Sequence, residues 1–186
     1  NEVIEEDKEL PKSKVKSMLM KWVDLHPHSI REKSKIILEH FINHTSNKIS
    51  GKSRGMLVTR SRLHCVKYKL EFDRQMKEMN LPYGCLVGFS GTVHDEDSEM
   101  DYTESSMNGF SQKYTEENFK DPQYRLLIVN NKFQTGFDEP LLHTMYVDKR
   151  LSGLQCVQTL SRLNRTTSGK NDTFVLDFVN EPDMIR

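Results

Sequence analysis

Three polar side chains recur at helical spacing in the last third of the chain: Gln158, Arg162 and Arg165. At 100° per residue these positions lie within roughly 60° of one another, so one helix face would carry an amide and two guanidinium groups. Two cations about one turn apart repel each other, whereas a guanidinium is a planar fork that pairs well with phosphate oxygens. The spacing therefore indicates an anion site, although a solvated helix face that carries two arginines fits the same pattern.

Two elements precede this helix and must position it. A polar loop, Thr135-Gly136-Phe137-Asp138, is closed by Pro140, and a short β-rich run covers residues 144–148. The helix also needs an apolar side that packs against the rest of the domain. We expect that side to be the i+3 series Leu154, Val157, Leu160 and Leu163.

The order of elements predicts the fold class. Apolar, β-rich runs occur at residues 55–59, 85–90, 124–129, 144–148 and 173–178. Helical patterns lie between them, and two more, at 15–25 and 29–44, come first. This alternation predicts an α/β domain with a mainly parallel sheet. Polar residues follow several of the strands, and open α/β sheets bind ligands outside the carboxyl ends of their strands, so we expect the site there.

Composition allows one domain of ordinary size with additional elements, since the chain has 186 residues of which 35% are hydrophobic and 29% charged. The formal net charge is zero, so nucleic-acid binding would need a local basic surface. Residues 45–70 contain no acidic residue and hold Lys48, Lys52, Arg54, Arg60, Arg62, Lys67 and Lys69. The stretch predicts either a DNA-phosphate patch or a solvated helix face.

Other metal and phosphate patterns are incomplete. His40 and His44 are four residues apart without a third ligand, so we predict no metal site. Ser50-Gly51-Lys52-Ser53 and Ser168-Gly169-Lys170 each precede a strand, whereas a P-loop follows a strand and opens a helix. We expect the acidic segment 94–109 to be a solvated insertion.

The cysteines Cys65, Cys85 and Cys156 are scattered and odd in number, which indicates reduced thiols in a cytoplasmic protein. No apolar run is long enough for a membrane span, and no signal peptide is visible. Because the chain begins at Asn1 and stops at Arg186, just after a strand-like run, we expect it to be a piece of a longer protein.

The polar loop and the arginine row resemble two motifs of superfamily 2 helicases. Thr135-Gly136-x-Asp138 is similar to motif V, and Gln158-x-x-Ser161-Arg162-x-x-Arg165 is similar to motif VI. Residues 132–142, 146–149 and 158–165 together resemble the second motor domain of the restriction (R) subunit of type I restriction-modification enzymes. The resemblance is specific over residues 124–180 and looser over 52–90. We refer to residues 135–138 as the motif V-like loop.

For the fold, the resemblance implies a RecA-like three-layer αβα motor domain over residues 46–186, preceded by an N-terminal helical segment or linker over 1–45. For the nucleotide, it implies that Arg165 is an arginine finger, with Arg162 beside it on the γ-phosphate side. Gln158 would orient the arginines or the attacking water.

The resemblance also assigns roles to the motif V-like loop and to a motif IV-like segment at residues 59–62. Gly136 and Asp138 would couple the nucleotide to the DNA-contacting face, Gly136 through close backbone approach and Asp138 by hydrogen-bonding an arginine or a ribose. DNA contacts are implied for Thr59, Arg60, Arg62 and Thr135.

The implied function is ATP hydrolysis and ATP-driven translocation of double-stranded DNA before cleavage by a type I site-specific deoxyribonuclease. ATP and Mg²⁺ would be bound mainly by a first RecA-like domain outside this chain, because the chain has no complete P-loop, and we expect the fragment alone to be inactive. The implied partners are DNA, the first motor and nuclease domains of the same subunit, and the methyltransferase and specificity subunits. A cytoplasmic, prokaryotic protein with no membrane partner is expected.

Three other functions stay open. The chain could be a non-catalytic module that binds DNA or a protein partner, or half of another superfamily 2 helicase or translocase. Alternatively, Asp138, Asp148 and Asp177 lie near predicted strand ends and could form a Mg²⁺-dependent phosphotransferase site.

Overall fold

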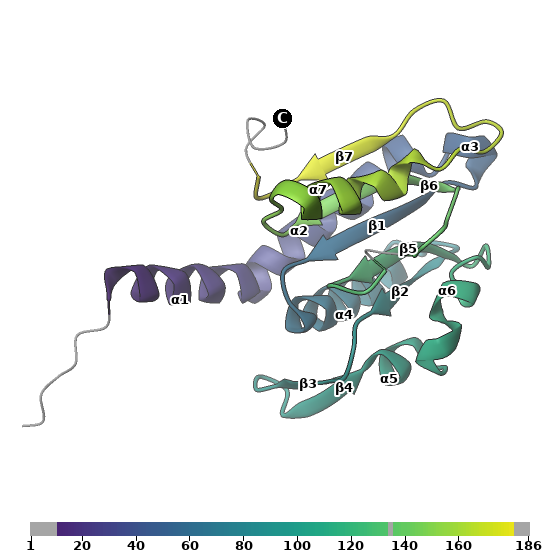
Figure 1. The fold of residues 1–186 in the computed structure, drawn as a ribbon. Coiled ribbons are helices and arrows are strands. Elements are labelled where there is room, and N and C mark those ends of the chain that lie inside the picture. Colours follow the sequence, from purple (N-terminus) through teal and green to yellow (C-terminus); the bar gives the residue numbers. More distant parts are fainter. Residues whose placement is uncertain (1–10, 134–135, 181–186) are drawn as a thin grey trace, which may run out of the picture.

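A five-stranded sheet with strand order β2-β5-β1-β6-β7 lies at the centre of the computed structural model, which describes residues 11–133 and 136–180 (Figure 1). Its strands are β1 (Arg54–Thr59), β2 (Gly84–Gly88), β5 (Tyr124–Val129), β6 (Leu142–Asp148) and β7 (Phe174–Asp177). All four pairings in this sheet are parallel. The predicted α/β class with a mainly parallel sheet is confirmed.

The central strands β1 and β6 are buried along their whole length. Successive residues of a strand point to opposite faces, so Leu57 enters one apolar core and its neighbours Met56 and Val58 enter another. A parallel sheet buried on both faces favours such continuous apolar runs. Polar side chains are therefore largely confined to the ends of these strands and to the loops.

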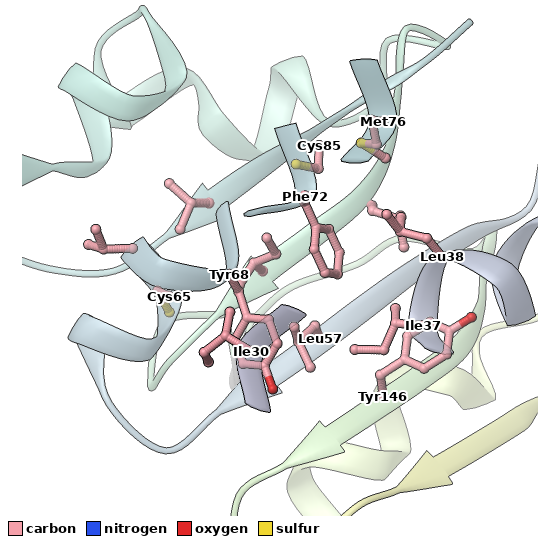
Figure 2. Packing of buried hydrophobic residues seen from close by; sticks show 14 of the residues in the cluster. Ile30, Ile37, Leu38, Leu57, Cys65, Tyr68, Phe72, Met76, Cys85 and Tyr146 are labelled. Atoms are coloured by element: carbon pink, nitrogen blue, oxygen red, sulfur yellow. The ribbon is translucent and has the colours of Figure 1, made fainter. Parts of the chain in front are cut away.

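Helices cover both faces, as the three-layer αβα prediction requires. On one face lie α2 (Pro27–His40), which continues as a π-helical turn (Phe41–Thr45), and α4 (Arg62–Glu78). Figure 2 shows Ile37 of α2 and Phe72 of α4 meeting Leu57 and Tyr146 of the sheet. The other face carries α6 (Thr115–Asn118), α7 (Gly153–Leu160) and the 3₁₀ turn η3 (Ser161–Asn164), with a short α3 (Lys48–Gly51) just before β1.

The first helix, α1 (Lys12–Leu25), extends away from the sheet and buries none of its residues (Figure 1). Pro27 separates it from α2 and occupies the first turn of that helix, where its fixed φ is favourable. The helix predicted to begin at Ser29 therefore starts two residues earlier. Because α2 shares the core with the sheet, it packs as part of this domain, and the division at residue 45 stays a prediction.

The acidic segment is more ordered than a solvated insertion. It forms most of a hairpin of β3 (Thr92–Asp95) and β4 (Met100–Thr103), and then α5 (Glu104–Asn108). The 3₁₀ turn η2 (Gln112–Tyr114) follows it. Glu104 is buried, and its carboxylate accepts hydrogen bonds from Phe89 N (2.9 Å), Thr115 Oγ1 (2.5 Å) and Lys132 Nζ (2.8 Å). The expectation is thus wrong for Glu104, because this carboxylate joins the insertion to the domain.

Across residues 11–133 and 136–180, none of the helices combines the length and the apolar character needed to cross a bilayer.

Gly55, in β1, lies against side chains of β5, β6 and the π-helical turn. A Cβ atom there would lie 2.8 Å from Leu126 Cδ2 and 3.3 Å from ring carbons of Phe41 and Tyr146. Adding volume to a well-packed core typically costs about 1–3 kcal/mol. We expect Gly55→Ala to lower the free energy of unfolding by about that amount in urea titrations of the 186-residue chain.

Gly84→Ala is the matched control for this substitution. The nearest atom to its Cβ would be Tyr124 Cδ1, at 3.9 Å, so the added methyl group meets ordinary contact distances. Equal unfolding free energies for the two variants would show that the packing around Gly55 is looser than described.

Candidate functional site

The predicted site residues divide between opposite ends of the sheet. Thr59 ends β1, so residues 59–62 lie at the carboxyl end. Asp138, in contrast, lies near the amino end of β6, because the carbonyl of the next residue, Glu139, accepts a hydrogen bond from Leu142 N (3.0 Å). Residues 130–141 connect the two ends of the sheet, and Phe137 is buried in the core of the face they cross. The expectation of a single site at the carboxyl edge is wrong for Asp138.

The motif V-like loop and the arginine row meet at this amino end. Arg165 Nε lies 3.3 Å from Asp138 Oδ1, and the two side chains are 56% and 63% exposed. Arg162 is half-buried and donates from Nη1 to the Phe137 carbonyl (3.2 Å). An exposed ion pair of this kind contributes about 0–1 kcal/mol, so Arg165 can leave it readily for another anion.

The arginine row does not share one helix face. α7 ends at Leu160, Arg162 lies in the 3₁₀ turn η3, and Arg165 has extended backbone angles (φ −68°, ψ 133°). A 3₁₀ turn has about 3.0 residues per turn, so α-helical spacing no longer keeps side chains in line. The structure brings Arg162 and Arg165 to the loop, whereas Gln158 stands exposed on the last turn of α7.

The apolar side predicted for this helix is only half buried. Leu163 is 3% exposed, but Leu154 is 71% and Val157 65% exposed. A strict i+3 series turns by about 60° per step, so its first and last members face opposite directions. The series that faces the domain is instead Cys156, Thr159, Leu160 and Leu163.

Backbone conformation explains the glycine of the motif V-like loop. Gly136 has φ +75°, a left-handed value that favours glycine, and a Cβ there would meet nothing within 4 Å. The conformation itself therefore favours glycine here, and the expected close backbone approach stays a prediction. Phe133 packs against Phe137 with ring centroids 5.3 Å apart, which anchors the loop to the core. Thr135 lies outside the described residues.

At the carboxyl end, the predicted DNA contacts differ in access. Thr59 is fully buried, and its Oγ1 lies 3.0 Å from the Val129 carbonyl, so the hydroxyl is not presented to a ligand at the surface. Arg60 forms an ion pair with Asp24 of α1. Arg62 is exposed and donates to the Ser90 carbonyl (2.9 Å). Of these three, Arg62 is the best placed to meet a phosphate.

The basic stretch 45–70 is largely neutralised by carboxylates from elsewhere in the chain. Lys67 binds Asp95 (2.9 Å) and Asp97 (2.8 Å) of the β3–β4 hairpin, and Lys48 binds Asp172 (2.9 Å). A stretch of sequence without acidic residues therefore does not form a purely basic surface here. The basic surface that could bind DNA phosphates is smaller than the sequence indicates.

Asp148 forms a buried polar cluster at the end of β6. Its carboxylate accepts hydrogen bonds from Tyr68 OH (2.5 Å) and Lys33 Nζ (3.0 Å), and Arg60 Nη2 lies 3.8 Å away. Burial and this carboxylate both raise the pKa of Tyr68, which stays a neutral donor. These contacts join α2 and α4 to the sheet.

This arrangement argues against the phosphotransferase alternative. Asp148 is fully buried among its partners, Asp177 caps the backbone of Val179 and Asn180 (2.8 Å each), and Asp138 lies at the other end of the sheet. Within the part of the chain that the structure describes, no group of three or more His, Cys, Asp or Glu side chains is placed to hold a metal ion. The three aspartates do not form one site.

Comparison with known proteins identifies the relatives of this chain. Residues 97–180 match the family model of type I restriction enzyme subunit R domain 3. The chain is 30% identical, over 187 residues, to the putative type I restriction enzyme MjaVIIP endonuclease subunit of Methanocaldococcus jannaschii, with 92% of this chain covered. The chain is a homologue of type I restriction enzyme R subunits.

Other R subunits show the same relationship. The putative MjaVIIIP endonuclease subunit of Methanocaldococcus jannaschii is 28% identical over 80% of this chain, and the SauCOLORF180P endonuclease subunit of Staphylococcus aureus is 28% identical over 70%. The chain spans only 15% of the MjaVIIIP subunit and 17% of the MjaVIIP and SauCOLORF180P subunits. It corresponds to about one sixth of the length of these relatives.

A solved structure supports the fold. The helicase Lhr of Mycobacterium smegmatis superposes with a TM-score of 0.52 at 12% identity, covering 77% of this chain and 16% of Lhr. At that identity the likeness concerns the fold alone. The R-subunit homologue thus has the RecA-like helicase fold that its motifs predict.

His64 is a buried titratable group of this R-subunit homologue next to Arg60. Its side chain is 1% exposed, and Nδ1 lies 2.6 Å from Ser61 Oγ, the N-cap of α4. Within the described residues, Nε2 has no hydrogen-bond partner. Burial, and secondly the charge of Arg60, lower the pKa of His64 from 6.5 to about 4. The folded domain therefore holds a neutral imidazole here.

Since the pKa of His64 is lowered on folding, its neutral form supports stability above pH 6.5, and this contribution is lost as pH falls toward 4. We expect the 186-residue chain to lose roughly 2 kcal/mol of unfolding free energy through this group between pH 7 and pH 5. In urea titrations, His64→Gln should show a smaller loss than wild type, and the exposed control His28→Gln should show the wild-type loss. The same pH dependence in wild type and His64→Gln would refute this role.

Proposed function

We propose that this domain is the second motor domain of a type I restriction enzyme R subunit and takes part in the ATP hydrolysis that drives translocation of double-stranded DNA before cleavage. The observation that carries the proposal is the exposed Arg165, paired with Asp138 of the motif V-like loop at 3.3 Å on a domain homologous to R subunits. The other functional parts, including the first motor and nuclease domains and the methyltransferase and specificity subunits, lie outside this chain in the proposal.

The proposed nucleotide chemistry divides between two domains. Within the described residues, no group of three or more His, Cys, Asp or Glu side chains is placed to hold a metal ion, and the proposal assigns Mg²⁺ and most nucleotide contacts to the first motor domain. Arg165 fits the remaining task, because an exposed guanidinium can stabilise negative charge on the phosphoryl group in transfer, an effect of about 10³–10⁵ in rate. Arg162, which holds the Phe137 carbonyl, keeps the loop beside it, and Gln158 is assigned to orienting the attacking water.

The proposed DNA face is the carboxyl end of the sheet. Arg62 is exposed there, and its Nη1 donates to the Ser90 carbonyl, which it can exchange for a phosphate oxygen. Arg60 faces the same end but is held by Asp24 and approaches Asp148. DNA and nucleotide would thus contact opposite ends of one sheet.

Removal of the arginine finger tests the nucleotide assignment. In the intact R subunit, assembled with its partner subunits, we expect Arg165→Ala to lower DNA-stimulated ATPase kcat by about 10³-fold or more, because charge on the transition state loses its partner. The thermal unfolding midpoint should change little, since the Asp138 pair is exposed.

Arg74→Ala is the matched control, because this exposed arginine also forms ion pairs, with Glu71 and Glu78, on a helix away from the site. Its ATPase activity should equal that of wild type. Normal ATPase activity in Arg165→Ala would exclude the arginine-finger role and leave the non-catalytic binding module as the better function.

Salt dependence tests the DNA face. We expect Arg62→Ala in the intact R subunit to weaken binding to double-stranded DNA for all sequences alike and to reduce the slope of log K against log salt by about 1, as for the loss of one phosphate contact. Lys77→Ala, at the far end of the same helix, is the control and should leave the slope unchanged. An unchanged slope for Arg62→Ala would remove it from the DNA interface.

A further inference from the structure

Lys170 lies in a tight turn between η3 and β7. Its backbone N–H donates to the Thr167 carbonyl (3.2 Å), and Gly169 within the turn has φ +83°, which favours glycine. The turn directs the half-buried lysine side chain back toward the end of η3. The Ser168-Gly169-Lys170 sequence is therefore a turn rather than a phosphate loop.

The Lys170 ammonium binds three backbone carbonyls. Nζ lies 2.6 Å from the Arg165 oxygen, 2.8 Å from the Leu163 oxygen and 3.2 Å from the Pro140 oxygen. An ammonium group has three N–H donors, so these acceptors can satisfy all of them. Hydrogen bonds to a charged donor are stronger than neutral ones, and burial increases their effect.

These carbonyls belong to the segments that carry the proposed nucleotide site. The last carbonyls of a helical turn lack partners within the turn, and a lysine can satisfy them. Arg165 has already left the helix, with ψ 133°, so helical hydrogen bonding does not hold its backbone in place. Pro140 lies two residues after Asp138, the ion-pair partner of Arg165. One ammonium thus ties the chain on both sides of the Asp138–Arg165 pair.

We infer that Lys170 is a positioning residue for Arg165: by binding the carbonyls of Arg165, Leu163 and Pro140, it fixes the guanidinium relative to the motif V-like loop. The inference rests on the proposed function of Arg165 in ATP hydrolysis. Lys170 does not itself contact nucleotide, because its donors already face protein carbonyls. Its effect reaches the reaction through the backbone of Arg165.

Substitution in the intact R subunit, assembled with its partner subunits, separates positioning from general stability. Lys170→Met keeps most of the aliphatic stem and removes the donors. We expect DNA-stimulated ATPase kcat to fall by about 10–100-fold while KM for ATP stays within about threefold, because a misplaced catalytic group costs rate. Lys170→Arg should restore much of kcat. Lys48→Met, which removes an exposed ion pair with Asp172 nearby, is the control and should retain wild-type kcat.

Two further measurements decide the inference. In an Arg165→Ala background, Lys170→Met should cause no additional loss of kcat, because both changes act through one group. Amide hydrogen exchange of residues 161–166 should rise in Lys170→Met and stay unchanged in Lys48→Met. The positioning role would be overturned if Lys170→Met lowered kcat by the same factor in the Arg165→Ala background as in the wild-type protein. Unchanged amide exchange at residues 161–166 in Lys170→Met would overturn it as well.

A failure of the positioning inference for Lys170 can be distinguished from a failure of the proposed function of Arg165. If Arg165→Ala alone had normal ATPase activity, the arginine-finger assignment would fail, whatever Lys170 does. The exchange measurement would then still decide whether Lys170 holds the Arg165 backbone. If Arg165→Ala abolished activity and Lys170→Met did not lower kcat, only the positioning inference would fail.

Discussion

Burial of the parallel sheet on both faces is the constraint on which the rest of this domain depends. β1 and β6 have no solvent-facing side, so their polar chemistry collects where the strands end. Asp148 shows how strong this constraint is, since its carboxylate is buried at a strand end and needs Tyr68 and Lys33 as partners. Removing either partner would leave charge poorly compensated in a site shielded from water. The same cluster fixes α2 and α4 against the sheet and so holds the carboxyl end together.

The connection between β5 and β6 has described residues near both ends of the sheet. Near its start, Asn130 Nδ2 donates to the Thr59 carbonyl (3.0 Å), beside the proposed DNA face. Near its finish, Asp138 pairs with Arg165. Between them, Phe137 is buried in the core and Lys132 binds Glu104. In the proposed function, the contacts of this connection with both ends of the sheet would help to couple nucleotide to DNA.

Local patterns predicted the layers of this fold because apolar periodicity and strand length are properties of neighbouring residues. The family resemblance, and not a local pattern, predicts that the two motifs lie close together. Neither predicts the residues that complete the site. Lys48 meets Asp172 across more than a hundred residues, and Lys67 meets the β3–β4 hairpin, so the basic stretch loses its charge to distant partners. In the sequence, Lys170 stands out only as the last residue of an incomplete P-loop pattern. Its role depends on three carbonyls whose proximity no local pattern encodes.

The weakness of the Asp138–Arg165 pair is compatible with the proposed mechanism rather than opposed to it. Both side chains are more than half exposed, so solvent screens the pair, and breaking it costs little. A phosphate group in a closed, water-poor cleft would attract the same guanidinium far more strongly. In the proposed mechanism, the carboxylate would hold the arginine near its working position before nucleotide binds, while the backbone contacts of Lys170 and Arg162 persist. A tight, buried pair at this position would instead oppose each transfer of the arginine to nucleotide.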